Sequence, residues 1–110
     1  MTEHRYTTEE RVVQLTRLAA ALRDLIAEMR TVEQLSGNIA DYETLLGRCE
    51  TLLRNGFSPE EIPAFGRTVP DLFYRHKEWE PPREAWFERV EGRLRPVLDA
   101  AARLSEIGYY

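Results

Sequence analysis

The sequence predicts an all-α fold, a four-helix-type bundle built on a long N-terminal helical hairpin, and three observations support this prediction. Between positions 12 and 35, apolar residues recur every three or four positions, so they share one stripe of an α-helix. Glycine-containing pairs then interrupt the helical pattern at Gly37-Asn38 and at Asn55-Gly56. A second long apolar stripe occupies the last quarter of the chain. The length of 110 residues is that of a single helical domain, residues 1–110.

The first helix is predicted over residues 8–36, behind a polar arm of residues 1–7. Thr7 and Glu10 have the spacing of a capping box, in which each side chain satisfies a backbone N–H of the other. Gly37 suits the left-handed conformation that often ends a helix. The positions beside the stripe are mostly small or apolar, which favours burial among several helices over a two-stranded coiled coil. The stripe comprises Leu15, Leu18, Leu22, Leu25, Met29 and Val32.

The second helix is predicted over residues 39–54, with Asn38 as its N-cap and Asn55-Gly56 at its end. The connection between the two helices is short, so they should form an antiparallel hairpin. The apolar face of this second helix comprises Ile39, Tyr42, Leu45, Leu46, Cys49, Leu52 and Leu53.

Residues 57–82 are predicted to form short helical turns and loops rather than one long helix. Ser58 can cap a helix that has Pro59 at its first position. We expect Pro63 to restrict this helix to a single turn, because a proline inside a helix removes one hydrogen bond and clashes with the carbonyl four residues earlier. Gly66 should break the chain again, before a third short helix that starts near Pro70.

The last helix is predicted over residues 83–107, with Pro96 inside it. The carbonyl that the Pro96 ring would strike belongs to Gly92, where a local bend is sterically easy. We therefore predict a kink in this helix between Gly92 and Pro96, with a full break as the alternative. The apolar stripe of the helix comprises Trp86, Val90, Leu94, Val97, Ala101 and Leu104.

Composition excludes several classes of function. The formal net charge of −4 disfavours a general binder of nucleic acids or anionic membranes. Of the 15 basic residues all but Lys77 are arginine, a bias typical of a GC-rich bacterial genome. No apolar run approaches the length of about 18 residues that spans a membrane. The N-terminus also lacks a signal-peptide pattern, so we expect a cytoplasmic protein.

Aromatic residues concentrate between positions 57 and 87, and they supply the candidate interaction surface. Tryptophan and tyrosine dominate the energetically important positions of protein interfaces, so such a cluster can anchor a partner. The alternatives are a ligand pocket, or a cap on the end of the core where regular helix pairing stops. The candidate residues are Phe65, Phe73, Tyr74, His76, Trp79 and Trp86.

No pattern in the sequence predicts catalytic, metal-binding or cofactor-binding residues. His76 lies between Arg75 and Lys77 and could act as an acid or base, but no residue stands at a spacing that would complete a nucleophile–base pair. Cys49 is the single cysteine and falls on the apolar face of the second helix, where we interpret it as a core residue.

The sequence therefore favours a non-enzymatic helical protein–protein interaction module: an adaptor, an inhibitor or immunity-type partner, or a small assembly subunit. We expect its partner to be another protein or a second copy, as a homodimer. The alternative is a small-ligand-binding or catalytic bundle, with a pocket near His76, Trp79 and Trp86 to which Tyr42 and Tyr74 contribute. Nucleic-acid binding ranks third, because the proline spacing does not fit a helix-turn-helix motif.

Overall fold

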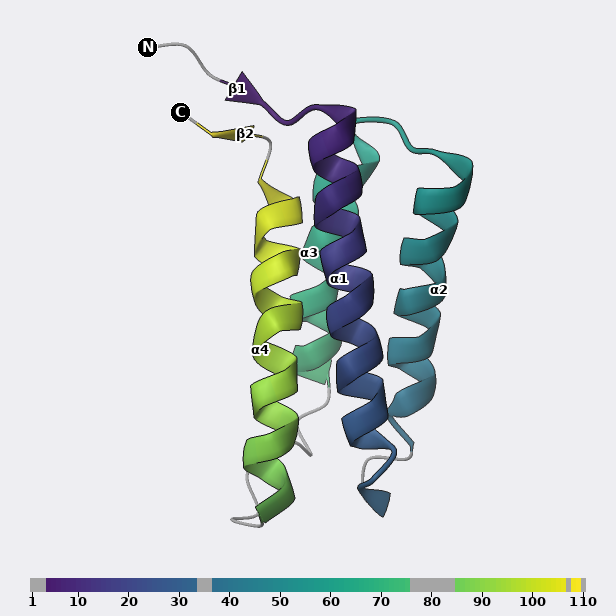
Figure 1. Cartoon of the computed structure of the whole chain (residues 1–110), viewed down its shortest axis with the longest axis vertical. Coiled ribbons are helices and arrows are strands. Elements are labelled where there is room, and N and C mark those ends of the chain that lie inside the picture. Colours follow the sequence, from purple (N-terminus) through teal and green to yellow (C-terminus); the bar gives the residue numbers. More distant parts are fainter. Residues whose placement is uncertain (1–3, 34–36, 76–84, 107, 110) are drawn as a thin grey trace.

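A computed structural model describes the backbone of residues 4–33, 37–75, 85–106 and 108–109, and the side chains of 5–33, 37–70 and 88–106. The described part is all-helical apart from one short pair of strands, so the predicted all-α class is confirmed (Figure 1). Its elements are β1 (His4–Arg5), α1 (Thr8–Met29), α2 (Ile39–Asn55), α3 (Glu61–Arg75), α4 (Ala85–Ser105) and β2 (Gly108–Tyr109).

Helix α1 occupies the middle of the fold. In Figure 1 it lies between α4 and α2, with the paler α3 behind it, and successive helices run in opposite directions. The closest helix pairs are α1 with α4, α3 with α4, and α1 with α2. Strands β1 and β2 pair antiparallel, with His4 opposite Tyr109, and they bring the two ends of the chain together.

The hydrophobic core lies between these helices. The predicted stripe of the first helix is buried, from Leu15 to Met29 in α1 and at Val32 beyond its end, as is the stripe of α4 from Val90 to Leu104. Helix α2 contributes Tyr42, Leu45 and Cys49. Helix α3 contributes Ile62, Phe65 and Val69.

The start of α1 agrees with the prediction, and its end does not. Glu10 N–H donates to Thr7 Oγ1 over 3.2 Å, and Thr7 N–H donates to Glu10 Oε1 over 2.9 Å, so the capping box is formed. The helix ends at Met29, seven residues before the predicted end at Ser36. Beyond Met29 the backbone tightens, because the N–H groups of Thr31 and Val32 donate to the carbonyls three residues earlier, those of Glu28 and Met29, over 3.1 and 3.0 Å.

The two ends of α2 also differ in how well they were predicted. Asn38 occupies the N-cap position, but its backbone is in the right-handed helical region and its side chain makes no capping hydrogen bond. The prediction of an Asn38 side-chain cap was therefore wrong. Gly56 ends the helix at φ 88°, a conformation that side chains disfavour.

The segment 57–82 contains the largest departure from prediction. Instead of short turns and loops, it holds one helix of 15 residues, α3. We predicted that the helix would begin directly after Ser58, which would place Pro63 inside it. The helix instead begins at Glu61, so Pro63 is its third residue. The first four N–H groups of a helix have no helical partner, and the carbonyl four residues earlier, at Pro59, precedes the helix.

Gly66 and Pro70 do not break α3 either. A methyl group at Gly66 would lie 2.7 Å from the backbone nitrogen of Ser105 and 2.9 Å from the carbonyl oxygen of Ala101. Glycine is therefore required here because the backbones of α3 and α4 are in close contact. Helix α4 likewise continues through Pro96, so the alternative of a full break is wrong.

Candidate functional site

The first candidate site is a hollow at the end of the fold where the chain ends meet, hereafter the end hollow. It has a volume of about 280 Å³. Three segments that are distant in the sequence form it: β1 with the start of α1, the connection between α2 and α3, and the first turns of α3. Its lining residues are Arg5, Tyr6, Thr8, Arg11, Phe57, Pro59, Glu60, Pro63 and Arg67.

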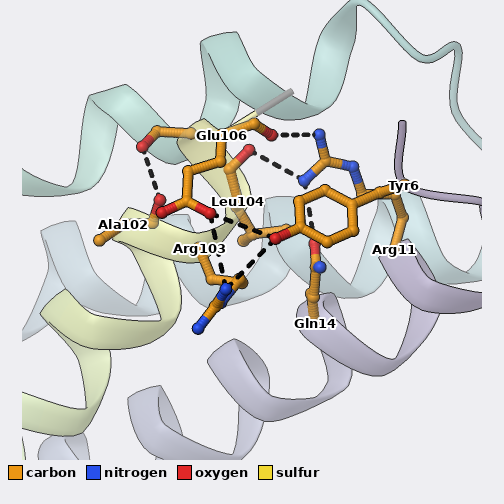
Figure 2. A network of polar contacts seen from close by, with 8 residues as sticks. Tyr6, Arg11, Gln14, Ala102, Arg103, Leu104 and Glu106 are labelled. Carbon is orange, nitrogen blue, oxygen red and sulfur yellow. Dashed lines mark hydrogen bonds and ion pairs between the residues drawn. The ribbon is translucent and has the colours of Figure 1, made fainter. Parts of the chain in front are cut away.

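Arg11 forms the inner wall of the end hollow and joins α1 to the end of α4 (Figure 2). The residue is 5% exposed. Its Nη1 donates to Gln14 Oε1 over 2.9 Å and to the Leu104 carbonyl over 3.2 Å, and its Nη2 donates to the Glu106 carbonyl. The guanidinium also lies over the Tyr6 ring, 4.7 Å from its centroid. The side chain is therefore fixed by contacts on several sides.

A second set of contacts surrounds the Tyr6 hydroxyl, as Figure 2 shows. The hydroxyl donates to Glu106 Oε2 over 3.2 Å and accepts from Arg103 Nη1 over 3.3 Å. Arg103 and Glu106 also form an ion pair of 3.6 Å. The hydrogen bond to Tyr6 raises the pKa of Arg103. Burial lowers the pKa of Arg11, against the opposing effect of nearby Tyr6, Glu10 and Glu106.

The end hollow is locally positive in a protein that is acidic as a whole. Three arginines line it, and Glu60 is its one carboxylate. Arg5 and Arg67 are exposed, and within the part of the chain that the structure describes neither makes an ion pair or a side-chain hydrogen bond. Six other described arginines are paired with carboxylates: Arg23, Arg30, Arg89, Arg93, Arg95 and Arg103.

The second candidate site is the side of α1 that faces away from the core. Its exposed residues follow a three- and four-residue spacing of their own, on the helix face opposite the buried stripe. We call this set the outer ridge. None of the other described helices covers it, since α1 lies in front of α3 with α4 and α2 at its sides (Figure 1). The outer ridge comprises Val13, Arg17, Ala20, Asp24 and Ala27.

A groove between α1 and α4 runs beside the outer ridge and shares Arg17 with it. Its volume is about 480 Å³. Its walls carry small or rigid apolar residues beside charged ones, so a partner could pack against apolar surface and form ion pairs in the same groove. Its lining residues are Gln14, Arg17, Ala21, Pro96, Asp99, Ala100 and Arg103.

Cys49 has the structural role that its position in the sequence suggested. The side chain is fully buried, and its thiol donates to the Leu15 carbonyl over 3.2 Å. Burial raises the pKa of this thiol to about 11. The thiol therefore stays protonated at neutral pH and is a poor nucleophile.

Of the six residues predicted to form an interaction surface, the structure describes the side chain of Phe65 alone. Phe65 is 1% exposed, so its assignment to a surface was wrong. The cause is the unbroken α3, which turns this ring into the core, where the Arg48 guanidinium lies 5.5 Å from its centroid. The others lie outside the described residues, either entirely (His76, Trp79) or in their side chains (Phe73, Tyr74, Trp86).

Sequence reasoning did not find the residues of the end hollow. Arg5 lay in a segment interpreted as a polar arm, and Arg67 lay in a segment interpreted as a break. No local signal connects positions 5, 11 and 67, because only the tertiary fold brings them together.

Tyr42, which was proposed to line a pocket, is instead a core residue that is 1% exposed.

No family model, no curated protein and no solved structure matches the chain. The two candidate sites described above are therefore the basis of the functional proposals. Among the described residues, no three His, Cys, Asp or Glu side chains are grouped so that they could hold a metal ion. None of the described helices combines the length and the hydrophobicity needed to cross a membrane.

Proposed function

We propose that the protein is a non-enzymatic helical interaction module, an adaptor, inhibitor or small assembly subunit, that self-associates through the outer ridge of α1. The observation that carries this proposal is the ridge itself. It presents a regular stripe on the exposed side of the central helix, and its Val13 side chain is 51% exposed. Helices pair along stripes of this spacing, and three of the five ridge positions carry apolar or small side chains, those of Val13, Ala20 and Ala27.

The outer ridge is complementary to a second copy of itself. If two α1 helices pair antiparallel about Ala20, Val13 of each copy lies opposite Ala27 of the other. Arg17 lies three residues from the axis and Asp24 four, so the two opposite charges are offset by about 1.5 Å along the helix and can still pair. A two-fold axis repeats both contacts, as in most homodimers. The small side chain at Ala20 would allow the helices to approach closely at the axis.

The groove beside the ridge would widen this interface onto α4. Pro96 and Ala100 supply apolar wall, and Asp99 and Arg103 supply charge of both signs. A local bend of α4 between Gly92 and Pro96 is part of the proposal, because it would set the width of the groove. The cytoplasmic location and the bacterial source inferred from composition remain predictions.

The test is a charge exchange across the proposed two-fold axis. Sedimentation equilibrium should give a dimer for the wild-type protein. Asp24→Arg places a second guanidinium opposite Arg17 at both symmetry-related contacts. If each contact changes by about 1 kcal/mol, the dimer should weaken about thirtyfold. Adding Arg17→Asp should restore pairing, because both contacts are again between opposite charges.

A matched control makes the same change in charge away from the ridge. Glu33 is exposed and lies beyond the end of α1, so Glu33→Arg should leave the dimer unchanged. A wild-type protein that stays monomeric at high concentration would refute self-association. A dimer that survives Asp24→Arg would place the interface elsewhere.

A further inference from the structure

We propose that the end hollow binds a small organic carboxylate with an apolar body. This inference goes beyond the interaction module, since it concerns another face of the molecule and rests on different residues. The hollow's volume of about 280 Å³ is near the lower end of the range for small-molecule sites, roughly 300 Å³. A ligand of this size would have room for one ring or short chain and one charged group.

The charge of the hollow selects an anion. Arg5 and Arg67 line it, and within the described residues no carboxylate pairs with either of them. A guanidinium presents its N–H groups in a planar fork that matches a carboxylate, and the charge on both partners strengthens these hydrogen bonds. Two such groups from separate elements, β1 and α3, could hold one carboxylate between them.

Arg11 would act on the ligand at longer range. Three of its five N–H groups already donate, to Gln14 and to the carbonyls of Leu104 and Glu106, and the residue is buried, so it would contribute mainly charge. Its fixed position means that this charge is present before a ligand arrives. A preorganised charge contributes more to binding than one that must be ordered.

The remaining lining selects the body of the ligand. Phe57, Pro59 and Pro63 supply apolar surface, and the two prolines hold the backbone rigid. Glu60 adds a negative charge beside the arginines, which disfavours a dianion such as phosphate. The combination favours a monoanion whose other end is aromatic or aliphatic.

The experiment is a titration of the full chain with phenylacetate, monitored at each step by two-dimensional ¹H–¹⁵N NMR. We expect saturable shifts at residues that line the hollow, such as Thr8 and Glu60. Phenylacetamide, which has the same shape without the charge, should bind at least about tenfold more weakly. Inorganic phosphate, which has charge without an apolar body, should also bind more weakly than phenylacetate.

Two variants connect the binding to the hollow. Arg67→Gln removes one guanidinium and should weaken phenylacetate binding about tenfold. Arg95→Gln removes an exposed arginine of α4 that pairs with Glu91, outside the hollow, and should change nothing. The NMR spectra themselves show whether each variant is folded as the wild type is.

Several results would overturn the proposal. Absence of shifts at millimolar phenylacetate would exclude the site, and equal binding of phosphate would indicate nonspecific attraction of anions. Equal losses in Arg67→Gln and Arg95→Gln would point to the overall charge instead of the hollow. Asp24→Arg, which tests the outer ridge, should bind phenylacetate normally, so failure of one proposal can be distinguished from failure of the other.

Discussion

Gly66→Ala should destabilise the protein, although alanine is normally the better helix former. The added methyl carbon would lie 2.7 Å from the Ser105 nitrogen, 2.9 Å from the Ala101 oxygen and 2.9 Å from Leu104 Cβ. Two of these neighbours are backbone atoms of α4, which cannot rotate away as a flexible side chain can. Helices α3 and α4 would therefore have to move apart along their contact.

The magnitude follows from two opposing effects. Overpacking a close contact typically costs 1–3 kcal/mol of stability. Because the neighbours here are rigid backbone atoms, we expect a cost at the upper end of this range, about 3 kcal/mol. The higher helix propensity of alanine returns about 1 kcal/mol. We therefore expect a net loss of about 2 kcal/mol in the free energy of unfolding.

Urea denaturation followed by circular dichroism measures this loss, and Gly47→Ala is the matched control. Gly47 lies inside α2, and a methyl group there would have nothing within 4 Å. The control should gain about 1 kcal/mol, because it keeps the propensity gain without a clash. The reasoning would be refuted if Gly66→Ala were as stable as the wild type or if both variants shifted in the same direction.

Two further predictions concern buried polar groups. Arg11→Met should lower the free energy of unfolding by about 2–4 kcal/mol in urea denaturation, because the carbonyls of Leu104 and Glu106 lose a charged donor; a loss below about 0.5 kcal/mol would show that water replaces it. Burial raises the pKa of Cys49 from 9.0 to about 11, so the unfolded chain loses this proton first. Stability should therefore fall between pH 9 and 11 by up to about 3 kcal/mol relative to Cys49→Ala, and parallel pH profiles of the two proteins would contradict the assignment.

Local patterns predicted those parts of the fold that depend on local interactions. The stripe of α1 and the capping box of Thr7 and Glu10 involve residues three or four positions apart, and the structure contains both. The end of α1 was missed because the backbone changes at Thr31 and Val32 to hydrogen bonds between residues three apart, although the apolar stripe continues to Val32.

Helix α3 shows how a small error in a boundary changes a whole segment. With its first residue at Glu61, Pro63 falls in the first turn, where a proline is tolerated. With a start directly after Ser58, the same proline falls inside the helix and ends it. The end hollow was missed for a different reason, since Arg5, Arg11 and Arg67 meet only through contacts between distant segments.

The contact between α1 and α4 has a consequence for how the chain folds. Arg11 bonds to Leu104 across 93 positions of sequence, whereas α1 with α2, and α3 with α4, are neighbours along the chain. The two hairpins can therefore form early, but on a ribosome the side of α1 that meets α4 stays exposed until α4 has been synthesised. Docking of the α3–α4 hairpin onto α1 is therefore the step that we expect to come last, because it joins segments that are distant in the sequence.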